Sequence, residues 1–263
     1  MTPKEVAILA AQTAGKLVRE SLGTITPDDI QDKRPFDYVT AVDKACEKLI
    51  IDLIRQHYPD HEILAEESGN SSQKNSFRWI IDPLDGTTNF IHHFPHSGVS
   101  IALEKEAEVI LGVVYDPYRD ELFWAEKGGG AYCNGKRIAV SKHARLSHCL
   151  IATGFPFKEK QLIDRYWSVL SAIFMAVSGI RRTGSAALDL TYVACGRFDG
   201  FFELRLSLWD IAAASIIVRE AGGKITDFEG HENRLLSGSI IATNGLIHQF
   251  MLAEVQKIFP TNP

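Results

Sequence analysis

The sequence of 263 residues predicts a layered α/β fold, in which helices and sheets alternate. Strand-like and hairpin-like segments dominate residues 78–138, whereas helix-like and strand-like segments alternate from about residue 149 onward. The hydrophobic content of 45% is sufficient for a large buried core. We therefore expect one compact unit with two halves, an N-terminal α+β half over residues 1–145 and a C-terminal α/β half over residues 146–263.

The N-terminal half should begin with two helices. Apolar residues recur at helical spacing over residues 6–18, and Gly23 is a suitable stop. A capping pattern at residues 40–43 precedes a second helix, which should end near Tyr58. Strands are then expected at residues 78–82, 97–105, 109–117 and 121–138, the last segment being a hairpin closed by Asn134 and Gly135.

In the C-terminal half, the periodicity of the apolar residues changes repeatedly between the helical and the strand pattern. A closing helix is expected over residues 246–259. The segments that alternate before it cover residues 185–196, 198–204, 210–222, 224–228 and 239–244.

The composition limits the partners of this chain. With 28 basic and 33 acidic residues, the net charge is −5, so the sequence lacks the basic footprint of a nucleic-acid-binding protein. No apolar run approaches the roughly 18 residues that span a bilayer, and the N-terminal segment does not have the pattern of a signal peptide. We expect a cytoplasmic protein without a nucleic-acid or membrane partner, and with reduced thiols at its separated cysteines, Cys46, Cys133, Cys149 and Cys195.

The segment "WIIDPLDGTTNF" places two carboxylates, Asp82 and Asp85, at the end of an apolar run. The run and Pro83 predict a strand followed by a turn, because proline cannot donate to a sheet ladder. Two carboxylates on such a turn can converge, and oxygen ligands of this kind suit Mg²⁺. Backbone N–H groups near Thr87 are suited to holding a phosphate oxygen if they open a helix. The same composition is equally typical of an ordinary turn.

Two further acidic positions have simpler interpretations when each is taken alone. Glu66 and Glu67 end a short apolar segment and resemble a solvated loop. Asp210 precedes an apolar helix that should stop at Gly222, so it resembles an N-cap. However, the preceding Trp209 and the apolar helix place Asp210 at the edge of the core, where a carboxylate needs a partner such as a cation.

Taken together, these motifs resemble a known family. "DPLDGTTNF", the upstream "AEESG" and the downstream "WDIAAASIIVREAGG" are similar to the inositol monophosphatase family of Mg²⁺-dependent, lithium-sensitive sugar phosphatases. The similarity continues through "DYVTAVDKACE", "GVVYDP", "GGGAYCNG" and "GSAALDLTYVACGRFDGFFE", and it covers residues 36–245. The resemblance implies the sugar-phosphatase fold, in which helical layers alternate with two sheets in the order αβαβα.

The resemblance also implies a set of ligands for two or three Mg²⁺ ions. Glu66, Asp82 and the backbone carbonyl of Leu84 would hold the first ion. Asp82, Asp85 and Asp210 would hold the second, and a weaker third ion would lie near Glu66. Asp82 would therefore bridge two ions, and Glu67 would be a neighbour of the site.

Catalytic and substrate-binding positions are carried over in the same way. Thr87, placed by Asp43, would help to orient and deprotonate the attacking water beside Glu66. The phosphate would contact the backbone of Gly86 and Thr87. The alcohol part of the substrate would contact Asp85, Gly184, Ser185, Ala186 and Glu203.

The activity implied by the resemblance is hydrolysis of inositol 1-phosphate, or of a similar sugar or polyol phosphate, by metal-activated water in a protein that is usually a homodimer. Fructose 1,6-bisphosphate and nucleotide 3′-phosphates are alternative substrates. A hypothesis of another class is a binding protein of the transcription machinery with incidental catalysis. The sequence alone selects no physiological substrate.

Other motifs are given less functional weight. A transition-metal site at His92, His93 and His96 suits the chemistry less well than the carboxylates suit a hard cation. The glycines at residues 128–130 are expected to form a turn, and Ser185 a helix start. Ion pairs are the simpler expectation for Arg181 and Arg182, with attraction of an anionic substrate as the alternative.

Overall fold

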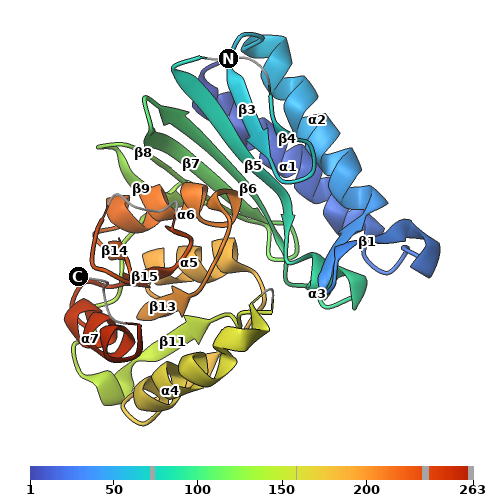
Figure 1. Ribbon diagram of the computed structural model, residues 1–263. Helices are drawn as coiled ribbons and strands as arrows, with labels where there is room; N and C mark the ends of the chain where they lie inside the picture. The colour runs from blue at the N-terminus through green and yellow to red at the C-terminus, as the bar shows by residue number, and fades with distance from the viewer. Residues whose placement is uncertain (72–74, 158, 233–236, 260–263) are drawn as a thin grey trace.

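The computed structural model describes residues 1–71, 75–157, 159–232 and 237–259. Helical layers and sheets alternate through it: a helix pair, an eight-stranded sheet, a second helix pair, a five-stranded sheet and a third helix pair (Figure 1). Three hydrophobic clusters fill the spaces between successive layers. The predicted αβαβα arrangement is therefore confirmed.

The first layer consists of α1 (Pro3–Ser21) and α2 (Ala41–His57), which pack on β5, β6 and β7. Each helix starts with a capping box, in which an N-cap threonine and an acidic residue three positions later satisfy each other's backbone N–H groups. Thr2 and Glu5 cap α1, and Thr40 and Asp43 cap α2. Both predicted helices are confirmed, as is the capping pattern at residues 40–43.

The eight-stranded sheet has the order β10-β9-β8-β7-β6-β5-β3-β4. Within this sheet, only the pair of β3 and β5 is parallel among the described residues. Asn134 and Gly135 both have positive φ and close the hairpin between β9 and β10, as predicted. The strands are β3 (Glu62–Ala65), β4 (Gly69–Asn70), β5 (Phe77–Asp85), β6 (Gly98–Lys105), β7 (Glu108–Asp116), β8 (Glu121–Glu126), β9 (Gly130–Cys133) and β10 (Lys136–Ile138).

The middle layer consists of α5 (Ala186–Ala194) and α6 (Leu208–Glu220), which lie between the two sheets (Figure 1). A run of alanines lets α6 approach the eight-stranded sheet closely. A Cβ on Gly112 of β7 would lie 2.2 Å from the carbonyl oxygen of Ala213, so only glycine permits this contact. Because α6 is packed from both sides, its N-terminal turn, which carries Asp210, has a fixed position at the edge of both sheets.

The five-stranded sheet has the order β12-β11-β13-β15-β14, with β11 parallel to both neighbours and β15 antiparallel to both of its own. Its outer face is covered by α4 (Ile163–Phe174) and α7 (His248–Ile258). The strands are β11 (Leu150–Thr153), β12 (Gly179–Arg181), β13 (Gly200–Glu203), β14 (Lys224–Asp227) and β15 (Ile240–Thr243).

Some elements were not predicted from the sequence. These are α4, its flanking strands β11 and β12, the short strand β4, and the small hairpin of β1 (Ile30–Arg34) and β2 (Asp37–Thr40). Tyr166, Val169 and Ile173 of α4 are buried at helical spacing, but no side chain caps the helix start at Leu162. Short 3₁₀ turns lie at Pro27–Asp29, Leu146–His148 and Lys160–Leu162.

The predicted end of the β5 strand requires a correction. The sequence places a turn at Pro83, directly after Asp82, whereas β5 continues to Asp85. The pairing with β6 is irregular between Asp82 and Asp85, and a proline is tolerated at such a bulge because its missing N–H leaves no broken ladder bond. The turn comes at Gly86, and the bulge brings Asp82, Leu84 and Asp85 to the end of the sheet.

No helix among the described residues has both the length and the apolar character that crossing a membrane requires.

Candidate active site

A cavity of about 500 Å³ opens where the ends of β3, β5 and β13 meet the starts of α5 and α6. It is bordered by segments that are far apart in sequence. Its lining includes the end of β5 with the turn into α3 (Thr87–Ile91), and the segment that follows β11. The predicted site residues that line it are Glu66, Asp82, Leu84, Asp85, Gly86, Thr87, Gly184, Ser185, Ala186, Glu203 and Asp210.

The turn at Gly86 links the metal-type carboxylates to the start of α5. Gly86 has φ +100°, and a Cβ there would lie 3.1 Å from the carbonyl oxygens of both Gly184 and His96, so glycine is required. Asp85 Oδ2 accepts hydrogen bonds from Ser185 Oγ at 2.6 Å and from the backbone N–H of Ala187 at 2.7 Å. Asp85 is thereby fixed between the two halves of the chain.

Thr87 and Asp43 form the predicted pair. Thr87 Oγ1 lies 2.9 Å from Asp43 Oδ1 and 3.1 Å from the carbonyl oxygen of Leu84. Asp43 is fully buried at the start of α2, where it also accepts the backbone N–H of Thr40 at 2.8 Å. Burial raises the pKa of Asp43. Asp43 does not line the cavity, and it reaches the lining through its hydrogen bond with Thr87.

Glu66 and Glu67 follow β3 and share one lysine. Lys33 Nζ lies 3.0 Å from Glu66 Oε1 and 2.6 Å from Glu67 Oε1. The Glu67 side chain is 7% exposed, and its burial raises the pKa of the carboxyl to about 7 despite the lysine. Neither acid is therefore a freely solvated loop residue. The contact also places Glu67 beside Glu66, outside the cavity lining.

Asp82 lies at the centre of a crowded group of acids. It is 1% exposed, and burial together with the negative charges of Glu66, Asp85 and Asp210 raises its pKa well above the usual range. The pKa of Asp85 is raised to about 6, mainly by burial, while its hydrogen bonds from Ser185 and Ala187 act in the opposite direction. The acids are held together against their mutual repulsion.

This donor set fits hard divalent cations. Carboxylate and carbonyl oxygens are the ligands that Mg²⁺ prefers, and a cation would relieve the repulsion around Asp82. Among the described residues, no three of the predicted ligand side chains have ligand atoms that all lie within 4.8 Å of one another.

The part of the cavity lining around Glu203 has a different character. The Glu203 side chain packs against Gly154, where a Cβ would lie 2.0 Å from Glu203 Oε1. Burial raises the pKa of Glu203 well above its usual range, and the positive charge of Arg182 opposes that rise. The Arg182 guanidinium lies 5.0 Å from the ring centroid of Phe157. This part of the lining can therefore offer both acceptors and an apolar edge to a ligand.

Several sequence interpretations can now be compared with the structure. Asp210 is the third residue of α6, not its N-cap: Ser207 is the N-cap, and its N–H donates to Asp210 Oδ2 at 2.7 Å. Ser185 is the N-cap of α5, as predicted. The expectation of ion pairs was wrong for Arg182 among the described residues, because it instead contacts aromatic rings and lines the cavity.

The remaining motifs lie outside the acidic group. The glycines at residues 128–130 form a turn into β9, as expected. His92 lines the cavity, whereas His96 is buried with an unpartnered Nε2, and its burial lowers the pKa to about 4. The metal-type group found among the described residues does not include His92, His93 or His96.

Sequence reasoning missed part of the cavity wall. Gly154, Phe155 and Phe157 follow β11, a strand that was not predicted, and their composition indicates only a turn. Asp189 is a helical residue with ordinary surroundings in the sequence. No local signal marks these positions, because their roles depend on contacts with residues that are distant in the chain.

Comparison with known proteins agrees with this geometry. The model of the inositol monophosphatase family matches residues 3–259. The Nus factor SuhB of Escherichia coli strain K12 is 47% identical over 252 residues, which cover 95% of this chain and 94% of that protein.

Two solved structures share the fold at substantial sequence identity. The extragenic suppressor protein suhB from Bartonella henselae has a TM-score of 0.91 at 43% identity, with 96% of this chain and 98% of that chain covered. The inositol monophosphatase from Anabaena has a TM-score of 0.87 at 40% identity, with 97% and 95% covered. With the fold, the cavity and these similarities in agreement, the chain belongs to the inositol monophosphatase family.

Proposed function

We propose that the protein is a Mg²⁺-dependent phosphomonoesterase that hydrolyses inositol 1-phosphate or a similar sugar or polyol phosphate to the alcohol and inorganic phosphate. The observation that carries this proposal is the group of buried, mutually repelling carboxylates around Asp82, with the Thr87 and Asp43 pair beside it. Family membership supports it, because the inositol monophosphatase family is generally Mg²⁺-dependent.

The proposed metal ligands are Glu66, Asp82, Asp85, Asp210 and the backbone carbonyl of Leu84, for two or three ions. When bound, Mg²⁺ supplies charge neutralisation on the phosphate oxygens and lowers the pKa of a water molecule. The acids in the cavity and the buried position of Asp82 fit this role, because ionised carboxylates in such a setting need cationic partners.

The protein residues position the attacking water. The Thr87 hydroxyl donates to Asp43, which leaves an oxygen lone pair of Thr87 directed to accept a hydrogen bond from water. Glu66 provides a second acceptor in the same cavity. In this proposal the attacking water transfers a proton to Glu66 or Thr87, which acts as the general base. The phosphate is assigned to the backbone N–H groups of Gly86 and Thr87, at the left-handed turn.

The alcohol part of the substrate is assigned to the part of the cavity that Glu203 and Asp85 line. Glu203 and Asp85 are the proposed acceptors for hydroxyl groups, and Gly184, Ser185 and Ala186 form the adjoining wall. An uncharged polyol suits this pair of acceptors. Fructose 1,6-bisphosphate and nucleotide 3′-phosphates remain the alternative substrates, and the presence of Arg182 and Arg205 in the lining supports testing a second phosphate.

The test is release of phosphate from inositol 1-phosphate, fructose 1,6-bisphosphate and a nucleotide 3′-phosphate, each with Mg²⁺ and with a chelator. We expect chelator-sensitive release that is fastest with inositol 1-phosphate. Asp85→Asn should reduce the rate by at least about 10³-fold, because several kcal/mol of charge stabilisation are lost. Full activity of Asp85→Asn would show that the metal assignment is wrong.

A second candidate function comes from the relatives. Proteins 42–47% identical to this chain carry the name Nus factor SuhB, which supports a role as a binding partner of the transcription machinery. Binding of the wild-type protein to purified RNA polymerase would test it. Asp85→Asn separates the two functions, because we expect it to abolish phosphate release while leaving such binding intact.

Two further assignments accompany the family resemblance. We propose that the protein is a homodimer and that it acts in the cytoplasm. Light scattering coupled to size-exclusion chromatography would measure the mass of the particle in solution, and a mass of one chain would contradict the dimer.

A further inference from the structure

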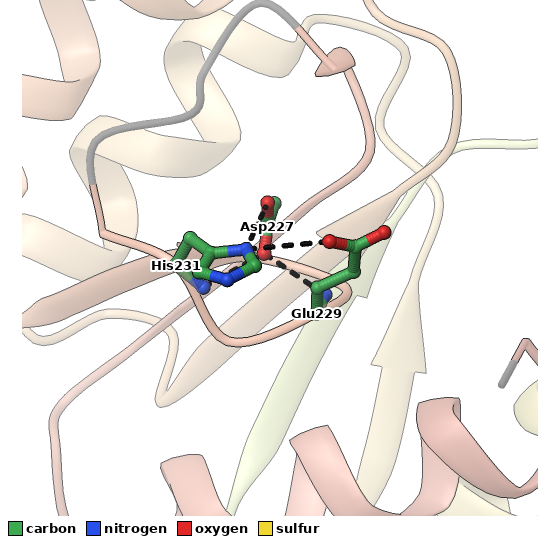
Figure 2. Close-up of side chains that lie close together, drawn as sticks. All are labelled: Asp227, Glu229 and His231. Atoms are coloured by element: carbon green, nitrogen blue, oxygen red, sulfur yellow. Dashed lines mark hydrogen bonds and ion pairs between the residues drawn. The ribbon is translucent and has the colours of Figure 1, made fainter. Parts of the chain in front are cut away.

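A second group of metal-type side chains lies at the end of β14, outside the lining of the main cavity. Asp227 ends the strand, and Glu229 and His231 follow in the next turn. Figure 2 shows the imidazole ring of His231 facing both carboxylates. His231 Nδ1 lies 3.1 Å from Asp227 Oδ2 and 3.4 Å from Glu229 Oε2.

The turn itself brings these three side chains together. Asp227 Oδ1 accepts the backbone N–H groups of Glu229 at 2.9 Å and of His231 at 2.8 Å. Gly230 has φ +95°, which allows the chain to reverse between those two residues. Asp227 is 3% exposed and is therefore held rigidly. Its second oxygen, Oδ2, is directed at the ring.

The spacing of the three ligand atoms suits an ion of the size of zinc. Zinc binds imidazole nitrogen and carboxylate oxygen at about 2.0–2.2 Å, so tetrahedral geometry places neighbouring ligand atoms about 3.4 Å apart. The two measured separations, 3.1 and 3.4 Å, are close to that value. One imidazole with two carboxylates is also a mixed donor set, which favours a first-row transition metal over Mg²⁺.

Two of the three side chains line a second cavity. Asp227 and Glu229 border this cavity of about 330 Å³, which gives an ion and its remaining water ligands an entry path. Leu204 and Arg205 line this cavity and the main cavity alike, so the group lies near the active site without being part of it.

We propose that Asp227 Oδ2, Glu229 Oε2 and His231 Nδ1 form a binding site for a divalent ion of the zinc class, with water completing the coordination. The ion would cross-link the end of β14 to the turn that follows it. The proposal does not depend on the phosphatase function, because none of these residues lines the main cavity.

The competing explanation is an ordinary ion pair, in which His231 donates its Nδ1 proton to the carboxylates. The chain offers a matched control for it. His143 Nδ1 lies 3.0 Å from Asp199 Oδ1, and its side chain is 57% exposed, compared with 49% for His231. His143 and Asp199 belong to no metal-type group of three among the described residues. A histidine paired with one carboxylate should not bind zinc comparably.

The experiment is titration of the intact protein with Zn²⁺ by calorimetry, with Mg²⁺ in large excess to occupy the carboxylates of the main cavity. Co²⁺ serves as the spectroscopic probe, since its visible absorption reports coordination by nitrogen and oxygen with fewer than six ligands. The variants are His231→Gln, Glu229→Gln and the control His143→Gln. Asp82→Asn serves to exclude binding in the main cavity.

We expect one Zn²⁺ per chain in the wild type, in His143→Gln and in Asp82→Asn, with displacement of Co²⁺ and loss of its absorption. His231→Gln should weaken the binding at least about 100-fold, because removing even an outer partner of a ligand commonly costs 10–100-fold. Glu229→Gln tests the same site if His231→Gln lowers the melting temperature. Equal Zn²⁺ affinity in wild type and His231→Gln, or no saturable binding in the wild type, would overturn the proposal.

Discussion

Two buried carboxylates in this protein, Asp116 and Asp82, differ in the hydrogen bonds that they receive. Asp116, at the end of β7, is fully buried and accepts four hydrogen bonds, from the backbone N–H groups of Tyr118 and Arg119, from Arg119 Nη1 and from Tyr192 Oη. Asp82 is as deeply buried, but its backbone donor among the described residues is the N–H of Leu84 at 3.0 Å.

This difference separates Asp116, a structural carboxylate, from Asp82, the central acid of the candidate site. A buried carboxylate that receives several donors stabilises the fold, because each hydrogen bond to a charged group contributes about 1.5–3 kcal/mol. A buried carboxylate beside other acids destabilises the fold until a cation binds. Electrostatic repulsion is therefore stored in the cavity at the ends of β3 and β5.

The largest effects on stability are expected for substitutions of Asp116 and Asp82, measured in the presence of a chelator. Asp116→Asn places an amide against four donors, and we expect it to lower the free energy of unfolding by about 2–3 kcal/mol. Asp82→Asn removes a negative charge from a repelling group, so it should raise the melting temperature by a few degrees, at about 2–4 °C per kcal/mol for a chain of this size.

The sign of the Asp82 effect follows from linkage. The folded protein raises the pKa of Asp82, so the ionised form opposes folding at pH 7 and protonation relieves that cost at low pH. The stability gained by Asp82→Asn should therefore shrink as the pH falls. Denaturation in urea at two pH values measures this change. Destabilisation of both variants to the same extent would contradict the distinction between the two groups.

A second prediction concerns Glu203, whose carboxyl group packs against Gly154 in the cavity. Alanine at Gly154 would put a Cβ 2.0 Å from Glu203 Oε1, so the carboxylate must move. A displacement of about 1 Å at a reacting or binding group can cost about 10²-fold, and we expect kcat/KM to fall by that order. The matched control is Gly179→Ala, where the new Cβ would meet nothing closer than 3.4 Å.

Steady-state kinetics with the preferred phosphate ester would measure both glycine variants. Glu203→Gln provides the comparison in which the side chain keeps its shape but loses its charge. We expect Gly154→Ala and Glu203→Gln to change KM in the same direction, because both act on the same acceptor. Unchanged kinetics in Gly154→Ala would show that Glu203 does not contact the substrate.

The parts of the candidate site also differ in how far the local sequence determines them. Asp82, Asp85 and Gly86 lie within five residues, and the strand, bulge and turn that place them act locally. The motif alone is equally typical of a ligand cluster and of an ordinary turn, and the resemblance of three separated motifs to one family favoured the cluster. The contact between Asp43 and Thr87 spans 44 positions and was predicted only through the family resemblance.

The missing parts depend on tertiary packing. Gly154 and Phe157 follow β11, a strand of four residues that owes its position to pairing with β12 and β13. Arg182 lines the cavity because its segment runs from β12 into the start of α5, and sequence alone favoured an ion pair. The layered fold was predictable from periodicity, whereas α4 was missed because no residue caps its first turn.

The smallest effect is expected for His248, a buried histidine with hydrogen-bond partners on both ring nitrogens. As the pH falls, its contribution to the free energy of unfolding decreases, whereas the destabilising effect of Asp82 is relieved. His248 is 3% exposed, and its Nε2 and Nδ1 lie 3.0 Å from the hydroxyls of Thr226 and Thr243. Burial, assisted by the positive charge of Lys224, lowers its pKa to about 4. The folded state therefore holds the ring neutral, while the unfolded chain takes up a proton below about pH 6.5.

The stability contributed by this histidine is complete above about pH 6.5 and is lost as the pH falls toward 4. Between pH 7 and pH 5 the loss should be about 2 kcal/mol. Urea denaturation of wild type and His248→Gln at both pH values measures it, with the exposed His148→Gln as control. We expect the drop to be smaller in His248→Gln and unchanged in His148→Gln. An equal drop in all three proteins would show that His248 takes up its proton in the folded state as readily as in the unfolded chain, which would contradict the prediction.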